Sequence, residues 1–215
     1  AYPLAIKALE KEGMAAAQKQ LRQNAYLLCV IALPATAGMI MLAPNIAAVL
    51  LGEAFREAAV MIIPVIAVAA MLAGVKAYYF DLSFQLGQTT MGQVWVTSVA
   101  ALVNILLNLL LIPLFGLLGA ACATLTAYAT GMLLSYLWGR KIFTLPLPLK
   151  EAGKIAMATG GMMLSLLPLR SYEGAWALVA QIIFGAAVFA ALLWVLGVIK
   201  LFREPQPDEV CCEHL

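Results

Sequence analysis

The chain has 215 residues, of which 64% are hydrophobic and only 11% are charged. Soluble domains carry about 25% charged residues, so this chain has too little polar surface to fold in water. The composition excludes a soluble protein and predicts an all-α integral membrane protein. The net charge of +2 is small, and the basic residues occur in short groups rather than in one large patch, which argues against a nucleic-acid partner.

The amino-terminal segment, residues 1–23, is charged and contains many helix-forming residues. Over residues 6–23 this pattern predicts an amphipathic linker helix on the cytoplasmic membrane surface, with an ordinary charged leader as the alternative. Residues 1–5 fit the last turn of an earlier span, and the chain begins without Met. We therefore expect it to be part of a longer protein.

Runs without charged side chains predict six transmembrane helices, because a span needs about 20 apolar residues. Proline and glycine support the boundaries: Pro44 follows the first span, Pro148 precedes the fifth and Pro168 closes it. The expected spans are residues 25–43, 58–79, 94–112, 117–138, 153–169 and 176–199.

The end of the second span carries a cation, Lys76, about one turn from the end of the helix. One interpretation is that its ammonium group reaches the lipid headgroups. The other is that it faces a water-filled cavity and pairs with a phosphate. Residues 80–88 are apolar for a loop, so we expect them to prolong the helix, with Asp81 and Gln85 on one face.

The longest uncharged run covers 58 residues, 82–139, and holds two spans and a hinge at residues 113–116. Proline lacks a backbone donor and glycine is flexible, so this hinge ends one helix and starts the next. Asn104 and Asn108 lie one turn apart before it, and Thr124 follows it. Because an unpaired amide is unfavourable in lipid, both interhelical hydrogen bonds and a polar pathway are possible roles.

Small residues recur at every fourth position along the fourth predicted span. Such a row lets a second helix approach closely, and we interpret it as a packing surface rather than a binding site. Its members are Gly119, Ala123, Ala127, Gly131 and Ser135.

Acidic and nucleophilic motifs are missing from the predicted spans. None of the eleven Asp and Glu residues lies in the middle of a span, so paired-carboxylate and metal-dependent catalysis lack candidates. Cys211, Cys212 and His214 do not have the spacing of metal ligands. We therefore expect no enzymatic activity, no cofactor and no metal site.

Lys and Arg are divided unequally between the two sides if the six spans alternate. Eleven fall on one side, whereas only Arg56 and Arg170 fall on the other. The positive-inside rule then places both termini in the cytoplasm and the hinge outside. The eleven are Lys7, Lys11, Lys19, Arg22, Lys76, Arg140, Lys141, Lys150, Lys154, Lys200 and Arg203.

Residues 104–124, NILLNLLLIPLFGLLGAACAT, resemble the pattern of polysaccharide flippases of the multidrug/oligosaccharidyl-lipid/polysaccharide exporter superfamily. Residues 34–38 (PATAG) and 49–55 (VLLGEAF) resemble the preceding helix and its external turn. Residues 77–87 (AYYFDLSFQLG) resemble the end of the next helix in exopolysaccharide members. The similarity covers roughly residues 1–142 and is generic beyond them.

Such transporters have two lobes of six spans, often with two extra carboxy-terminal spans. The resemblance implies that residues 24–142 are the four-helix part of the carboxy-terminal lobe, 143–201 two additional spans and 202–215 a cytoplasmic tail. It implies flipping of undecaprenyl-diphosphate-linked oligosaccharides (O-antigen or exopolysaccharide repeat units) across the bacterial cytoplasmic membrane. The partners would be the lipid-linked glycan, the bilayer and the glycan polymerase machinery.

Within this interpretation a cation must offset the diphosphate charge. Lys76 is the first candidate and Arg140 the second, while Asn104, Asn108 and Gln85 would bind sugar hydroxyls. Thr124 would line the same cavity. A multidrug or cation exporter is the alternative within the superfamily, and it would require carboxylates inside the membrane. A non-transporting membrane scaffold for glycan assembly is the alternative outside it.

Overall fold

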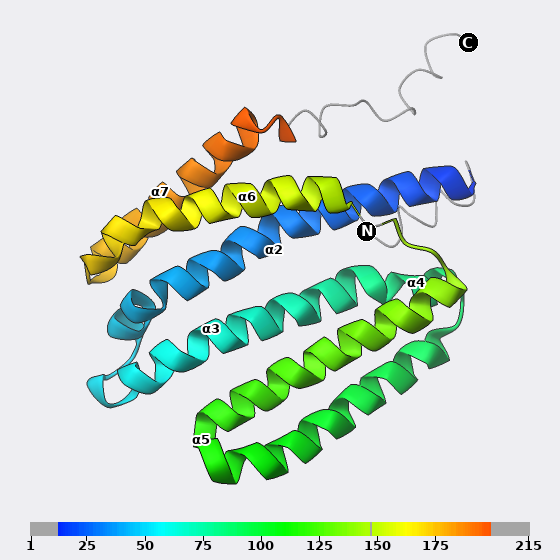
Figure 1. The fold of residues 1–215 in the computed structure, drawn as a ribbon, viewed down its shortest axis with the longest axis horizontal. Coiled ribbons are helices and arrows are strands. Elements are labelled where there is room, and N and C mark those ends of the chain that lie inside the picture. Colours follow the sequence, from blue (N-terminus) through cyan, green and yellow to red (C-terminus); the bar gives the residue numbers. More distant parts are fainter. Residues whose placement is uncertain (1–12, 147, 199–215) are drawn as a thin grey trace.

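The computed structural model describes residues 13–146 and 148–198, and these form helices and short connections without a strand. Within this part of the chain, five helices are long and apolar enough to cross a membrane. The predicted all-α class is confirmed (Figure 1). The elements are α2 (Met14–Leu50), α3 (Glu53–Val75), the π-helical turn η1 (Lys76–Phe80), α4 (Leu82–Leu86), α5 (Thr90–Ile142), α6 (Leu149–Leu166), the 3₁₀ turn η2 (Leu167–Ser171) and α7 (Ala175–Val195).

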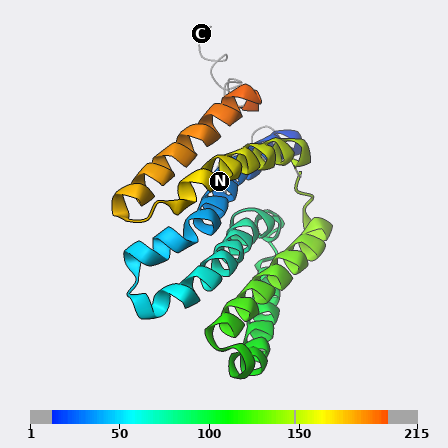
Figure 2. The same ribbon diagram turned by 60° about the vertical axis from the view of Figure 1, so that its left-hand side comes forward.

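Helix α2 lies in the middle of the bundle. It packs against α3 on one side and against α6 and α7 on the other, while α5 packs against α3 (Figures 1 and 2). Tyr26 of α2 belongs to a buried apolar cluster with Ile155 of α6 and Phe189 of α7. The Tyr26 hydroxyl also donates a 2.8 Å hydrogen bond to the Val198 carbonyl oxygen. The last two helices are therefore packed onto the rest of the chain and not simply tethered to it.

Helix α2 is longer than the predicted first span. Residues 14–23 continue into it without a break, and Pro34 and Pro44 lie inside it. The prediction that the helix ends at Pro44 is wrong, because packing against neighbouring helices can compensate for a backbone bond that proline removes. Residues 1–12 of the expected amphipathic helix lie outside the described residues.

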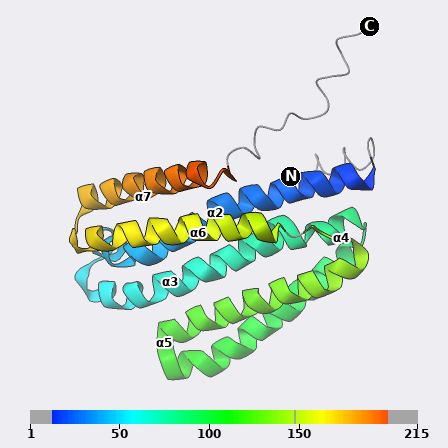
Figure 3. The ribbon, with the colours of Figure 1, turned by 45° about the horizontal axis from the view of Figure 1, so that its top comes forward.

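Helix α5 is a helical hairpin. Its 53 residues would span about 80 Å as a straight rod, far more than the roughly 30 Å hydrocarbon core. Gly116 interrupts it with φ 56° and ψ −132°, and the two arms run back along each other (Figure 3). The predicted hinge is thus confirmed, with the change of direction at the glycine rather than at Pro113.

A methyl group at Gly116 should strain this turn. We expect Gly116→Ala to lower the free energy of unfolding by about 1–3 kcal/mol, because a positive φ with this ψ disfavours side chains. Gly74→Ala is the matched control, since no atom lies within 4 Å of the added methyl group and helical Ala is favoured by about 0.5–1 kcal/mol. Unfolding by SDS in mixed micelles measures both. Equal stability of the two variants would contradict a strained hinge.

A buried amide pair fixes the turn between α6 and α7. Asn45 of α2 donates to the Gln181 Oε1 atom of α7 at 2.8 Å and accepts from the Gly174 backbone N–H at 2.9 Å. Gln181 donates to the carbonyl oxygens of Leu169 at 2.6 Å and Tyr172 at 3.1 Å. The side chains of Asn45 and Gln181 therefore satisfy the Gly174 N–H and the Tyr172 carbonyl oxygen of this turn, and they give the Leu169 carbonyl oxygen a second donor.

The helix directions place the charged ends together. The starts of α2 and α6 and the connections after α3 and α5 lie at one end of the bundle (Figure 1). At that end, Arg22 of α2 forms an ion pair with Glu151 of α6. Arg56 follows the turn between α2 and α3, and Arg170 lies in η2, both at the opposite end.

Candidate functional site

A cleft of about 430 Å³ lies where the end of α3 meets the two arms of α5. Three predicted site residues, Lys76, Asn104 and Thr124, line it together although they come from three separate helical segments. The other lining residues are Ala73, Ala77, Thr97, Ala100, Ala101, Ala127, Tyr128 and Gly131. The cleft thus combines one cation and several uncharged polar groups with a floor of small residues.

The π-helical turn determines where Lys76 points. The Asp81 backbone N–H bonds to the Lys76 carbonyl oxygen at 2.9 Å, a spacing of five residues. In an α-helix, residues five apart lie about 140° apart around the axis. The wider π turn brings the two side chains to the same side, and π turns are often found at functional sites. As a result Lys76 Nζ lies 2.8 Å from Asp81 Oδ2.

Asp81 is a buried carboxylate with three side-chain partners. It is 2% exposed. Besides Lys76, it accepts hydrogen bonds from Ser135 Oγ at 2.7 Å and Gln93 Nε2 at 3.3 Å, both from α5. A buried charge is tolerated when it is paired and hydrogen-bonded in this way. The network therefore joins the end of α3 to both arms of the hairpin.

Sequence reasoning missed this network. It placed Asp81 on a helical extension with Gln85, and α4 does continue the helix. The partner of Asp81 was not foreseen because a spacing of five does not bring two side chains together on an α-helix. Ser135 was assigned only to the packing surface, whereas its hydroxyl also binds Asp81.

The two asparagines have different environments. Asn104 Nδ2 lies 3.5 Å from Thr124 Oγ1, a long hydrogen bond across the two arms of α5. Asn108 Nδ2 donates to the carbonyl oxygen and to Oδ1 of Asn104, both at 2.9 Å. Asn108 therefore supports Asn104 from within the helix and is not among the residues that line the cleft.

All five residues of the predicted small-residue row on the second α5 arm are buried. A methyl group on Gly119 would overlap the Leu111 carbonyl oxygen of the first arm. One on Gly131 would lie 3.2 Å from Lys76 Cε and 3.2 Å from Ala100 Cβ. Gly119 thus allows the arms to approach, whereas Gly131 makes room for the lysine stem. Ala123 and Ala127 are buried on the same row.

The remaining predicted site residues lie outside the cleft. Gln85 is half-buried in α4, and Arg140 is exposed with its guanidinium carbon 5.9 Å from the Tyr136 ring centroid. The structure does not bring either of them to Lys76. Within residues 13–146 and 148–198, no three His, Cys, Asp or Glu side chains are grouped to hold a metal ion.

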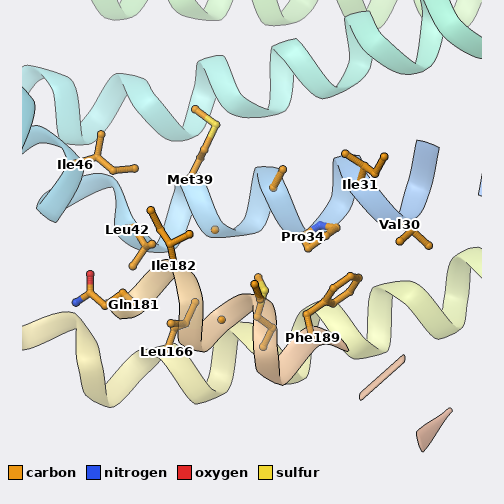
Figure 4. Close-up of a pocket in the computed structure, with 15 residues that line it drawn as sticks. Val30, Ile31, Pro34, Met39, Leu42, Ile46, Leu166, Gln181, Ile182 and Phe189 are labelled. Carbon is orange, nitrogen blue, oxygen red and sulfur yellow. The ribbon is translucent and has the colours of Figure 1, made fainter. Parts of the chain in front are cut away.

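A second hollow, an apolar groove of about 390 Å³, lies between α2, α6 and α7. Figure 4 shows Pro34, Leu42, Leu166 and Phe189 along it, with the Gln181 amide near one end. That amide is already bonded to Asn45 and to the turn. The groove therefore offers no free polar group to a sugar or a phosphate, and the cleft at Lys76 is the better candidate site.

Comparison with known proteins adds no assignment. No family model, no curated protein and no solved structure matches the chain. The functional interpretation therefore depends on the cleft and the charges around it.

Proposed function

We propose that the chain is the carboxy-terminal lobe of a flippase that moves undecaprenyl-diphosphate-linked oligosaccharides across the bacterial cytoplasmic membrane. The observation that carries this proposal is the convergence of Lys76, Asn104 and Thr124 on one cleft among helices of spanning length. Ionisable residues inside a membrane bundle commonly mark a substrate path. The assignment is to transport and not to catalysis.

The helix directions support an arrangement in the membrane. If the two arms of α5 cross separately, there would be six crossing segments, four of them in residues 24–142 and two in residues 143–201. The end with Arg22, Lys76 and Arg140 would face the cytoplasm under the positive-inside rule. Both termini would then be cytoplasmic.

The residues of the cleft would line one side of a larger cavity between two lobes, the usual place for substrate in such transporters. Lys76 would offset the diphosphate charge, and Asn104 and Thr124 would bind sugar hydroxyls. The lipid tail would stay in hydrocarbon while the lobes alternate between inward-open and outward-open states. Gln85 and Arg140 lie outside the cleft, so we assign them no substrate contact in this conformation.

A second candidate, the export of organic cations, is favoured by one observation, the buried carboxylate of Asp81. Such an exporter requires an acidic group inside the membrane. The Lys76 ammonium group, however, already pairs with that carboxylate at 2.8 Å. An organic cation would have to displace the ammonium group, whereas an anionic substrate can bind to it. This difference favours the flippase.

Surface polysaccharide in cells that carry the complete gene tests the proposal. We expect the double variant Lys76→Gln/Asp81→Asn to reach normal membrane levels, because it removes both charges of the pair, yet to lower polysaccharide about tenfold or more, as when about 1.4 kcal/mol of transition-state stabilisation is lost. Lys154→Gln, which changes an exposed lysine near the same end, is the control. Unchanged output from the double variant would remove Lys76 from the substrate path.

Flipping in vesicles separates transport from scaffolding. The purified complete protein should move a lipid-linked sugar from one leaflet to the other. Normal glycan assembly in cells without any flipping in vesicles would favour the scaffold function instead.

A further inference from the structure

The Lys76 ammonium group is held at Asp81, away from the Asn104–Thr124 pair of the same cleft. Its partner Asp81 is bonded to Ser135, whereas Thr124 and Asn104 face each other further along the hairpin. The lysine stem lies beside Gly131, which is seven positions from Thr124 on the same arm, or about 10 Å along the helix. A diphosphate whose sugar is bound by Asn104 and Thr124 therefore meets Lys76 only if the lysine turns away from Asp81.

The floor of the cleft permits that turn. Lys76 Cδ and Cε lie beside Gly131, at 3.4 and 3.2 Å from the place where a Cβ would be. Ala127 is the next residue of the same row toward Thr124 and also lines the cleft. The lysine stem can thus move along a surface without large side chains.

Turning away would leave the Asp81 carboxylate buried without a cation. Gln93 and Ser135 would still donate to it, but both are uncharged. A buried charge that loses its partner is strongly unfavourable, and an incoming dianion would repel it further. Proton uptake removes this obstacle, because a neutral carboxyl group can remain buried.

The other titratable groups around this turn have their own contacts. The Tyr79 hydroxyl donates to the Pro146 carbonyl oxygen, and Cys29 of α2 lies near Tyr79. Arg140 of α5 lies over the Tyr136 ring. The last two turns of α3 and all of α4 carry no titratable side chain. Lys76 is the one cation bonded to Asp81 among the described residues.

We propose that Asp81 is a proton-binding site coupled to anion capture by Lys76, an inference that rests on the proposed function. One proton from water binds to the Asp81 carboxylate, the lysine stays protonated, and its ammonium group pairs with the dianion in the cleft. No other bond changes. Release of the anion reverses the exchange, so the proton leaves Asp81 when the anion leaves the cleft.

Sulfate is a suitable probe, because it carries two negative charges, like a diphosphate diester, and does not titrate near neutral pH. Binding to the complete protein in lipid nanodiscs is measured by titration calorimetry in two buffers of different ionisation enthalpy. The wild type should take up about one proton per sulfate, and its affinity should fall up to about tenfold for each unit of rising pH. Asp81→Asn should bind sulfate more tightly, without proton uptake and without pH dependence. Lys76→Gln should not bind it.

The outcomes separate this inference from the function on which it rests. Binding that requires Lys76 but takes up no proton in the wild type would overturn the proton site and leave the anion site intact. Wild-type binding that is absent, or equal to that of Lys76→Gln, would overturn both. The number of protons that the wild type takes up per sulfate tests the proton site even if Asp81→Asn fails to fold.

Discussion

Replacing Lys76 with Met is expected to lower the free energy of unfolding by about 3–5 kcal/mol, the cost of breaking a buried ion pair from one side. The side chains of Lys76 and Asp81 are only 12% and 2% exposed, so water cannot replace the lost ammonium group. The loss should appear as earlier unfolding in an SDS titration in mixed micelles. It should also loosen the end of α3 from the hairpin.

A second substitution distinguishes the lost pair from lost packing. Lys76→Met/Asp81→Leu should recover most of the stability, because apolar side chains of similar volume often replace a buried pair without loss. Lys154→Met, at an exposed position, should change stability by less than about 0.5 kcal/mol. If Lys76→Met also cost less than about 1 kcal/mol, the pair would behave as an exposed one.

Replacing Gln181 with Leu should have the second-largest effect, a loss of about 3 kcal/mol or more. The change leaves the Asn45 amide group and the Tyr172 carbonyl oxygen without their partner, and the Leu169 carbonyl oxygen with only the Tyr172 N–H. Each buried group left unsatisfied costs about 1–3 kcal/mol. Faster hydrogen exchange of the turn at residues 167–174 would report the local part of this loss, and SDS unfolding the total.

Ile183→Leu is the matched control, since this residue of α7 is 64% exposed and conserves volume when it becomes Leu. It should leave both measurements unchanged. If the backbone amide hydrogens of the turn exchanged at the wild-type rate in Gln181→Leu, the Asn45–Gln181 pair would not be what holds α7 against α2.

Local sequence features were enough to predict much of the fold. Uncharged runs located the apolar helices, and the glycine after Pro113 located the turn of the hairpin. The cleft was also partly predictable, because an isolated lysine and an asparagine in lipid must face protein or water. Lys76, Asn104 and Thr124 meet there.

The missed features depend on contacts between distant residues or on unusual helix winding. Asn45 and Gln181 are 136 residues apart, and neither side chain signals its partner. Asn45 directly follows Pro44, where local rules predict a helix end, yet α2 continues to Leu50. Lys76 and Asp81 are close in sequence, but only a π turn brings them together. Helical periodicity, which assumes 3.6 residues per turn, cannot reveal such a pair.

The tip of the α5 hairpin also affects how this protein is made. Leu114, Phe115 and Leu117 are exposed there, and residues 82–139 carry no charged side chain. Moving a charged residue through the bilayer centre costs about 2.5–3.5 kcal/mol on insertion scales, and this hairpin avoids that cost entirely. Both arms can therefore enter the membrane together as one hairpin during synthesis, since no charged side chain lies between Leu82 and Gly139.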